Sequence, residues 1–389
     1  MFENLLHQDL VIHRLVKDAS DGSLPPALLF SGPAHAGKLT AALELARVLS
    51  CAEDGRWQCP CAHCRSHRAL AHSRTLLAGH RDLLPEIDAA VDVLLRDGSD
   101  APRYLLVRSA RKLLRRFDPV LWEGDEKKLV KARTSMERLA ETVDVLLPGK
   151  ALPGRRELKK AIKALKEDCA LLQKTLPSQL PVSQVRRITS WAVHSASGDH
   201  KTIILDGADK MPDASRNALL KFLEEPPADT TAILITDRKS LLLPTIVSRL
   251  RDYAFRGRRV AEEADVLRRV FREEEDRWGG LGEFFRSRKS GPSHELQSKA
   301  SQFLDGAKEG IPALPEGLSG KDHGDFVVFL EALLLELRRR WEQDDQPAHQ
   351  QYQREVALIR DARLRTESLN LPHSLVLKSL HVALGAPHA

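Results

Sequence analysis

The stretch SGPAHAGKLT nearly matches a loop that holds the phosphates of nucleotides. Gly32, Gly37 and Lys38 fit the pattern G-x-x-x-x-G-K-[ST], in which backbone N–H groups wrap the phosphates and the lysine reaches the β- and γ-phosphates. Leu39 occupies the position of the hydroxyl that holds Mg²⁺, and Thr40 comes one residue late, a rotation of about 100° on a helix. Two alternatives follow: a turn that no longer binds nucleotide, or a site that binds ATP without efficient hydrolysis.

Asp206 is a candidate for the same chemistry, because it ends the apolar run KTIILD and its carboxylate could orient Mg²⁺. Many nucleotide hydrolases place a glutamate next to this aspartate to activate water. Here Gly207 follows, and the next carboxylate is Asp209. We therefore expect no efficient ATP hydrolysis by this chain alone.

Cysteines form the second group of residues that could do chemistry. Four of the five are crowded together, as Cys51, Cys59, Cys61 and Cys64. Four thiolates suit a structural Zn²⁺ with no open position for catalysis. In a reducing compartment this clustering indicates metal rather than disulfides. Unligated thiols remain an alternative, as does His63 or His67 in place of one cysteine.

The elements that must position these residues alternate between strands and helices. Leu28 to Phe30 reads as a buried strand before the glycine loop, and an apolar helical pattern follows the loop through Leu49. Asp206 ends a second strand, and TAILITDR forms a third that ends near Thr236. This order predicts an α/β fold with a parallel sheet, whose ligands lie at the carboxyl ends of the strands.

Between these strands, about 50 residues have heptad spacing. The apolar positions are Leu129, Ala132, Met136, Leu139, Val143 and Leu146, then Leu158, Ile162, Leu165, Cys169 and Leu172. LPGKALPG separates the two runs, so we predict an antiparallel helical hairpin with arms that project about 30 Å. Cys169 falls on its seam and is expected to be core.

Charge is unevenly distributed over the 389 residues. From Arg103 to Lys174 there are 19 Lys and Arg against 10 Asp and Glu, a net of +9, whereas the whole chain is +6. No apolar run approaches the roughly 20 residues of a membrane span, and no secretory pattern begins the chain. We expect a cytoplasmic protein.

The chain after about Arg256 is charged and helical in pattern. DFVVFLEALLLELRRRW and HSLVLKSLHVAL are its amphipathic stretches. Breaks near Gly291 to Ser293 and Gly310 to Gly320 predict two small helical units.

Several stretches together resemble one family. NALLKFLEEPP (Asn217 to Pro227), LLPTIVSRL (Leu242 to Leu250), DGAD (Asp206 to Asp209) and the cysteine cluster occur in the order typical of bacterial clamp-loader subunits of the AAA+ class. Within that family the altered loop and the Asp-Gly pair resemble the delta-prime type of subunit rather than the ATP-hydrolysing gamma/tau type. The resemblance covers roughly residues 1–85 and 180–255.

This resemblance implies an architecture. It predicts an AAA+ P-loop domain over 1–252, with a zinc module at 51–64 and a helical insertion at about 89–177. A small helical lid at 253–315 and a helical collar for oligomerisation at 316–389 would follow.

The resemblance also implies a role in DNA polymerase III. The chain would be a stator in a hetero-oligomer with gamma/tau and delta subunits that places the sliding clamp on primed DNA. Arg249 matches the arginine of the family's Ser-Arg-Cys motif and would act in trans on ATP in a neighbour, while Leu250 replaces the cysteine. The four clustered cysteines match the zinc module. The alternatives are an ATP-hydrolysing gamma/tau-like subunit and a zinc-bearing nucleic-acid-binding protein on an inherited AAA+ sheet.

Residues from about 89 to 177 have no counterpart in this resemblance. They carry the basic excess, so one hypothesis is that the hairpin contacts the nucleic-acid backbone. A solvated hairpin and an arm that docks a partner are the alternatives.

Overall fold

The computed structural model describes residues 1–193, 200–274, 277–288, 294–310, 323–342, 349–369 and 371–386. The chain divides into two compact units, Met1–Arg288 and Lys289–Ala389. No helix in these described ranges is both long and apolar enough to cross a bilayer.

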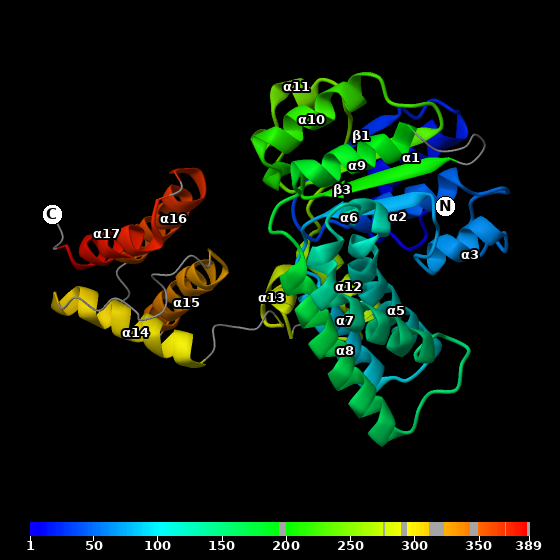
Figure 1. The fold of residues 1–389 in the computed structure, drawn as a ribbon. Coiled ribbons are helices and arrows are strands. Elements are labelled where there is room, and N and C mark those ends of the chain that lie inside the picture. Colours follow the sequence, from blue (N-terminus) through cyan, green and yellow to red (C-terminus); the bar gives the residue numbers. More distant parts are fainter. Residues whose placement is uncertain are drawn as a thin grey trace. The chain divides into compact units, whose positions relative to one another are not determined.

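A parallel five-stranded sheet lies at the centre of the first unit (Figure 1). Its strands are β1 (Ala27–Ser31), β2 (Thr75–Gly79), β3 (Lys201–Asp206), β4 (Thr230–Thr236) and β5 (Arg251–Ala254). They lie in the order β2-β3-β4-β1-β5, and every neighbouring pair is parallel. The predicted α/β class is confirmed. Because all strands are parallel and the glycine loop directly follows β1, the loop lies at the carboxyl edge of the sheet.

Both faces of the sheet are covered. Successive side chains of a strand point to opposite faces, so each strand contributes to two cores. Leu28 and Phe30 of β1 share a core with α1 (Asp9–Ser20) and α2 (Lys38–Leu49), whereas Leu29 belongs to the core on the other face. All five residues of β1 are buried. This accounts for the nearly unbroken apolar strands in the sequence.

A helical block connects β2 to β3. Its helices are α4 (Leu84–Arg96), α5 (Asp100–Leu114), the 3₁₀ helix η1 (Arg115–Phe117), α6 (Pro119–Trp122), α7 (Glu126–Val145), α8 (Arg155–Thr175) and α9 (Val182–Val193). α7 and α8 lie side by side as the predicted hairpin (Figure 1), and Cys169 is fully buried in its seam.

The hairpin differs from the prediction in one respect, since it does not project alone. α4 and α5 pack against it, and its seam residues belong to the same hydrophobic core as one face of the sheet. The reason is that α5 brings further apolar residues, such as Leu106 and Val107, which are buried in that core.

The first unit contains further helices that pack mostly against other helices. They are α3 (Ala62–Arg68), η2 (Ala208–Lys210), α10 (Asp213–Glu224), η3 (Lys239–Leu241), α11 (Pro244–Val247), α12 (Val260–Phe271) and α13 (Leu281–Arg286). Helices α12 and α13 share a small apolar core with α4, in which Phe271 and Phe284 pack 4.8 Å apart between ring centroids.

The second unit contains α14 (His294–Glu309), α15 (His323–Glu342), α16 (His349–Leu369) and α17 (His373–Gly385). They pack around Phe303, Phe326 and Phe329, so the predicted helical character of this region is confirmed. The predicted breaks at Gly291 to Ser293 and at 311–320 lie outside the described residues.

Candidate functional site

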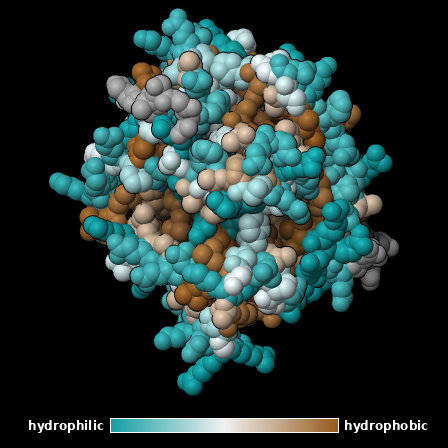
Figure 2. Space-filling model, turned by 90° about the vertical axis from the view of Figure 1, so that its right-hand side faces the viewer, coloured by the Kyte–Doolittle hydropathy of each residue, from teal (hydrophilic) through white to brown (hydrophobic). Residues whose placement is uncertain are grey.

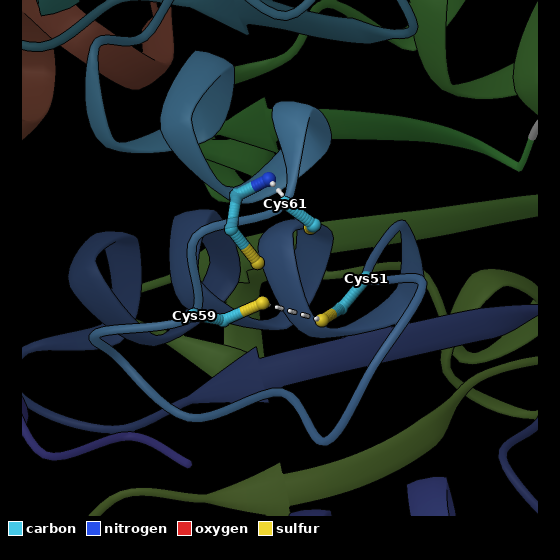
Figure 3. Close-up of side chains that lie close together, drawn as sticks. Cys51, Cys59 and Cys61 are labelled. Atoms are coloured by element: carbon cyan, nitrogen blue, oxygen red, sulfur yellow. Dashed lines mark hydrogen bonds between the residues drawn. The ribbon is translucent and has the colours of Figure 1, made fainter.

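The four clustered cysteines come together after α2. Their sulfur atoms all lie within 4.8 Å of one another, and the Sγ atoms of Cys51 and Cys59 are 3.6 Å apart. Figure 3 shows Cys51, Cys59 and Cys61 gathered in one small space between the end of α2 and the start of α3. Four sulfurs on a tetrahedral Zn²⁺, each about 2.3 Å from the metal, would be separated by roughly 3.8 Å. The cluster could therefore hold a metal ion, and its donor set is that of a structural zinc.

Main-chain groups favour the thiolate form of Cys61. Cys61 is the N-cap of α3, where its Sγ accepts a hydrogen bond from the backbone N–H of Cys64 at 3.4 Å. Burial raises the pKa of Cys61, but the backbone N–H groups of Cys64 and Ala52 outweigh it and bring the pKa to about 6. A thiolate is the form that binds metal.

Arg47 supports the cluster from α2. Its Nη1 donates to Cys64 Sγ at 3.0 Å, and its Nη2 donates to Glu44 Oε1 at 2.6 Å. Both Arg47 and Glu44 are buried. A Zn²⁺ with four thiolates carries a net charge of −2, so a buried guanidinium beside one thiolate favours the loaded cluster.

The two histidines proposed as substitute ligands lie elsewhere. Nδ1 of His63 is 3.0 Å from Nε2 of His72, and the ring of His67 stacks on His72 at 4.0 Å between centroids. Within the described residues, the cluster of metal-ligating side chains contains the four cysteines and no histidine.

The glycine loop connects β1 to α2 as predicted. Gly32 and Gly37 have φ values of 139° and 93°, which favour glycine. Lys38 is buried, and its Nζ donates to the carbonyl oxygens of Gly32 and Pro33 and pairs with Asp237 at 2.9 Å. The lysine therefore turns back onto its own loop.

Neither of the two residues after Lys38 offers a buried hydroxyl to a metal. Leu39 is buried in the core shared by β1 and α2, as its position one residue into the helix requires. Thr40 is half-buried on the next face of α2.

Asp206 lies at the carboxyl end of β3 and is bound by two arginines. Arg81 contacts both carboxylate oxygens at 2.7 and 2.8 Å, and Nη2 of Arg116 donates to Oδ2 at 2.8 Å. Burial raises the pKa of Asp206, but the charges and hydrogen bonds of Arg81 and Arg116 outweigh it and lower the pKa far below its ordinary value. Asp206 is thus an ionised carboxylate with both oxygens engaged.

This geometry does not fit a magnesium ion of the kind that the fold family places beside a nucleotide. Mg²⁺ needs free oxygen ligands at about 2.0–2.1 Å in an octahedron. Both oxygens of Asp206 already accept hydrogen bonds from arginine, and the two guanidinium charges beside them repel a cation. The loop keeps its glycines and its lysine, but the metal position is neutralised by arginine.

Arg249 lies just beyond α11. Its Nη1 donates to the carbonyl oxygen of Thr245 at 2.7 Å, and its Nη2 pairs with Glu224 at 2.5 Å. Glu224 belongs to the NALLKFLEEPP stretch, and the two side chains are one-third to one-half exposed. The structure therefore brings two of the family-like stretches together at the surface of the first unit.

Sequence reasoning missed Arg47, Arg81 and Arg116. Arg116 lies in the helical block, where arginines are common, so nothing in its spacing indicated Asp206 as its partner. Arg81 follows β2 by two residues, and its position at the same sheet edge as Asp206 was a usable signal.

Comparison with known proteins supports the resemblance. The family model described as DNA polymerase III, delta subunit, matches residues 7–79 and 151–258. The residues between these segments, 80–150, contain α4 to α7 and are unmatched. The expectation that the whole stretch from about 89 to 177 has no counterpart is therefore wrong for α8, which lies in the matched segment.

Individual relatives match shorter stretches. The DNA polymerase III subunit delta' of Pseudomonas aeruginosa is 46% identical over 69 residues, which is 18% of this chain and 21% of that protein. Its counterpart in Bacillus subtilis is 49% identical over 55 residues, 14% of this chain and 17% of that protein. The chain thus spans about a fifth of the length of the curated relatives it matches.

A solved DNA polymerase III gamma-subunit-related protein from Thermotoga maritima aligns over 52% of this chain and 78% of its own, with 19% identity and a TM-score of 0.29. That alignment is too loose to add weight. In the matched stretches, the chain is similar to delta-prime subunits of bacterial DNA polymerase III.

Proposed function

We propose that this chain is a delta-prime-like stator of a DNA polymerase III clamp loader. In that role it helps gamma/tau and delta subunits place a sliding clamp on primed DNA, and its neighbours hydrolyse the ATP. The observation that carries the proposal is the Arg81–Asp206–Arg116 cluster, because it binds the carboxylate that would otherwise be available to the metal that hydrolysis needs. Gly32, Gly37, Lys38 and Thr40 would at most hold ATP without turning it over.

The chain's catalytic contribution would be Arg249, acting in trans. The residue follows a short helix in the segment matched by the family model and is partly exposed. Its bond to Glu224 holds the guanidinium until a neighbouring γ-phosphate competes for it. An arginine supplied in this way contributes roughly 10³–10⁵ in rate in well-studied systems.

The remaining parts of the chain would have structural roles. The cysteine cluster would hold a structural Zn²⁺. Residues 253–315 would act as the lid, and residues 316–389 as the collar that joins the hetero-oligomer.

The test is DNA-stimulated ATP turnover by the reconstituted loader. We expect Arg249→Ala to reduce turnover at least tenfold while the complex still assembles. Arg251→Ala is the matched control, since Arg251 is also exposed and lies two residues away. Equal turnover by the two variants would make Arg249 an ordinary surface residue.

The second candidate is an ATP-hydrolysing gamma/tau-like subunit, favoured by the retained Lys38. It predicts ATP turnover by the isolated chain that is abolished in Lys38→Ala. The stator proposal requires that the isolated chain hydrolyse ATP no faster than Lys38→Ala.

A further inference from the structure

Two groups of basic residues in the helical block differ in what their side chains contact. The arginines of the first group donate to main-chain carbonyl oxygens: Arg103 to Leu147, Arg108 to Arg68, Arg111 to Ala69, Arg115 to Thr75 and Arg116 to Gly79. These guanidinium groups fasten α5 and η1 to β2, to the end of α3 and to the end of α7. They are part of the fold and are not available to a ligand.

The second group lies at the tip of the hairpin, where α7 ends and α8 begins. Its members are Lys150, Arg155, Arg156, Lys159 and Lys160. All five are exposed, and none has an ion pair or a side-chain hydrogen bond with the described residues. Farther along α8 this changes, because Lys163 pairs with Glu167 and Lys166 pairs with Asp88.

The tip charges do not favour the helix that carries them. The N-terminus of a helix bears a partial positive charge and is stabilised by acidic residues, but the first turn of α8 contains Arg155 and Arg156 beside the single acidic Glu157. The pairs Arg155–Lys159 and Arg156–Lys160 also repel each other, because residues four apart on a helix are neighbours. These charges destabilise the start of α8, and an external polyanion would offset that cost.

The chemistry of the tip favours a phosphate backbone over exposed bases. From Lys150 to Lys174 there is no aromatic side chain on which a base could stack. Three of the five tip cations are lysines, which offer a point charge to phosphate, and the two arginines can pair with phosphate oxygens bidentately. In Figure 2 the lower end of the molecule, where Figure 1 draws the tip of the hairpin, is hydrophilic.

We propose that the tip of the α7–α8 hairpin, residues 149–160, binds the phosphate backbone of duplex DNA without reading its sequence. This goes beyond the role in a clamp loader, because the contact is made by the chain itself. Lys150 lies outside the segments that the family model matches, and the other four tip residues lie inside the matched segment 151–258. The test uses the isolated full chain, so its failure would leave the stator proposal standing.

Deleting the hairpin is not a clean test, since α7 and α8 contribute to the core of the first unit. Arg156→Gln with Lys160→Gln removes two exposed charges instead. Lys127→Gln with Lys131→Gln is the control, because these residues are also exposed, four apart and on the same hairpin, but at the opposite end of α7. Binding to a duplex of about 25 base pairs is followed by fluorescence anisotropy between 50 and 200 mM salt.

Each lost phosphate contact lowers the slope of log K against log salt by about 0.9 and weakens binding by about eightfold at 0.1 M salt. We therefore expect the tip variant to bind at least tenfold more weakly, with a slope reduced by nearly two. The control should stay within twofold, and neither variant should melt below the unchanged chain.

Three results would overturn the proposal. In one, the tip variant binds duplex as tightly as the unchanged chain. In another, the control loses as much affinity as the tip variant, so that only net charge matters. In the third, poly-glutamate binds as tightly as duplex and loses affinity by the same factor, which would assign the tip to an acidic protein.

Discussion

At the scale of single residues, the arginines decide what the site can do. Arg81 and Arg116 convert an aspartate that could bind metal into one partner of a buried ion cluster, and Arg47 neutralises charge beside the cysteines. In both arrangements the charged groups are paired with other residues of the chain. They lead to predictions that separate structural from catalytic roles.

We expect Asp206→Asn to lower the free energy of unfolding by about 3–5 kcal/mol, because it leaves the buried guanidinium of Arg116 without a counter-charge. Urea denaturation at pH 7 measures this. Asp213→Asn is the control, since Asp213 is an exposed partner of Arg216 and should cost less than about 0.5 kcal/mol. Similar losses in the two variants would show that Arg81 and Arg116 do not depend on Asp206.

The same ion cluster predicts a pH dependence. The folded-state pKa of Asp206 lies below the value of about 4 that an unfolded aspartate has, so its contribution is present above pH 4 and is lost as the pH falls further. The stability difference between the unchanged chain and Asp206→Asn should therefore shrink below about pH 4. A difference that stays constant down to pH 2 would contradict the ion cluster.

For the cysteine cluster, we expect Arg47→Gln to weaken Zn²⁺ binding by about 10–100-fold, because a partner of Cys64 is lost. Competition with a chromogenic chelator measures the affinity. Arg56→Gln is the control, as that side chain is 77% exposed and pairs with Asp54 at the surface. A chain that binds no Zn²⁺ at all would support the alternative of unligated thiols.

The sequence predicted the site unevenly at this scale. Cysteine and glycine positions were found because spacing along the chain is what their chemistry requires. The partners of Asp206 come from 125 and 90 residues away, so no local pattern joins them.

At the scale of elements, the hairpin is part of the sheet domain's core. Its heptad pattern predicted both helices and their buried seam correctly. The sequence did not indicate which outer surface would be covered, because the partner helices α4 and α5 are amphipathic in their own right. A seam pattern describes only the contact between two helices.

We expect Leu165→Ala to destabilise the first unit by about 2–5 kcal/mol, since Leu165 is fully buried in the core shared with the sheet. Leu171→Ala, on the same helix but 42% exposed, should cost less than about 1 kcal/mol. Thermal and urea unfolding, monitored by a spectroscopic probe in the sheet, would measure the difference in stability between the two variants. If the sheet unfolds unchanged in Leu165→Ala, the hairpin is an independent element.

At the scale of the whole molecule, the chain consists of two units with separate cores. The first contains the loop, the cysteines, Arg249 and the hairpin tip. The second contains only helices among its described residues. Recognition and assembly can therefore be separated by truncation.

A chain that ends at Arg288 should fold, bind Zn²⁺ and bind duplex DNA as the full chain does, because all the residues involved lie in the first unit. It should fail to join gamma/tau and delta subunits if residues 316–389 act as a collar. Light scattering after size-exclusion chromatography would measure assembly. Normal incorporation of the truncated chain would place the oligomer contacts in the first unit.

The ion cluster at Asp206 also limits what single substitutions near the loop can change. Replacing Leu39 with threonine, or Gly207 with glutamate, would supply a residue type used for nucleotide hydrolysis, but Asp206 would still be held by Arg81 and Arg116. Removing either arginine alone would strand a buried charge and weaken the fold. Single substitutions in the loop or after Asp206 would therefore not create a free metal ligand at Asp206, and several simultaneous changes would be needed.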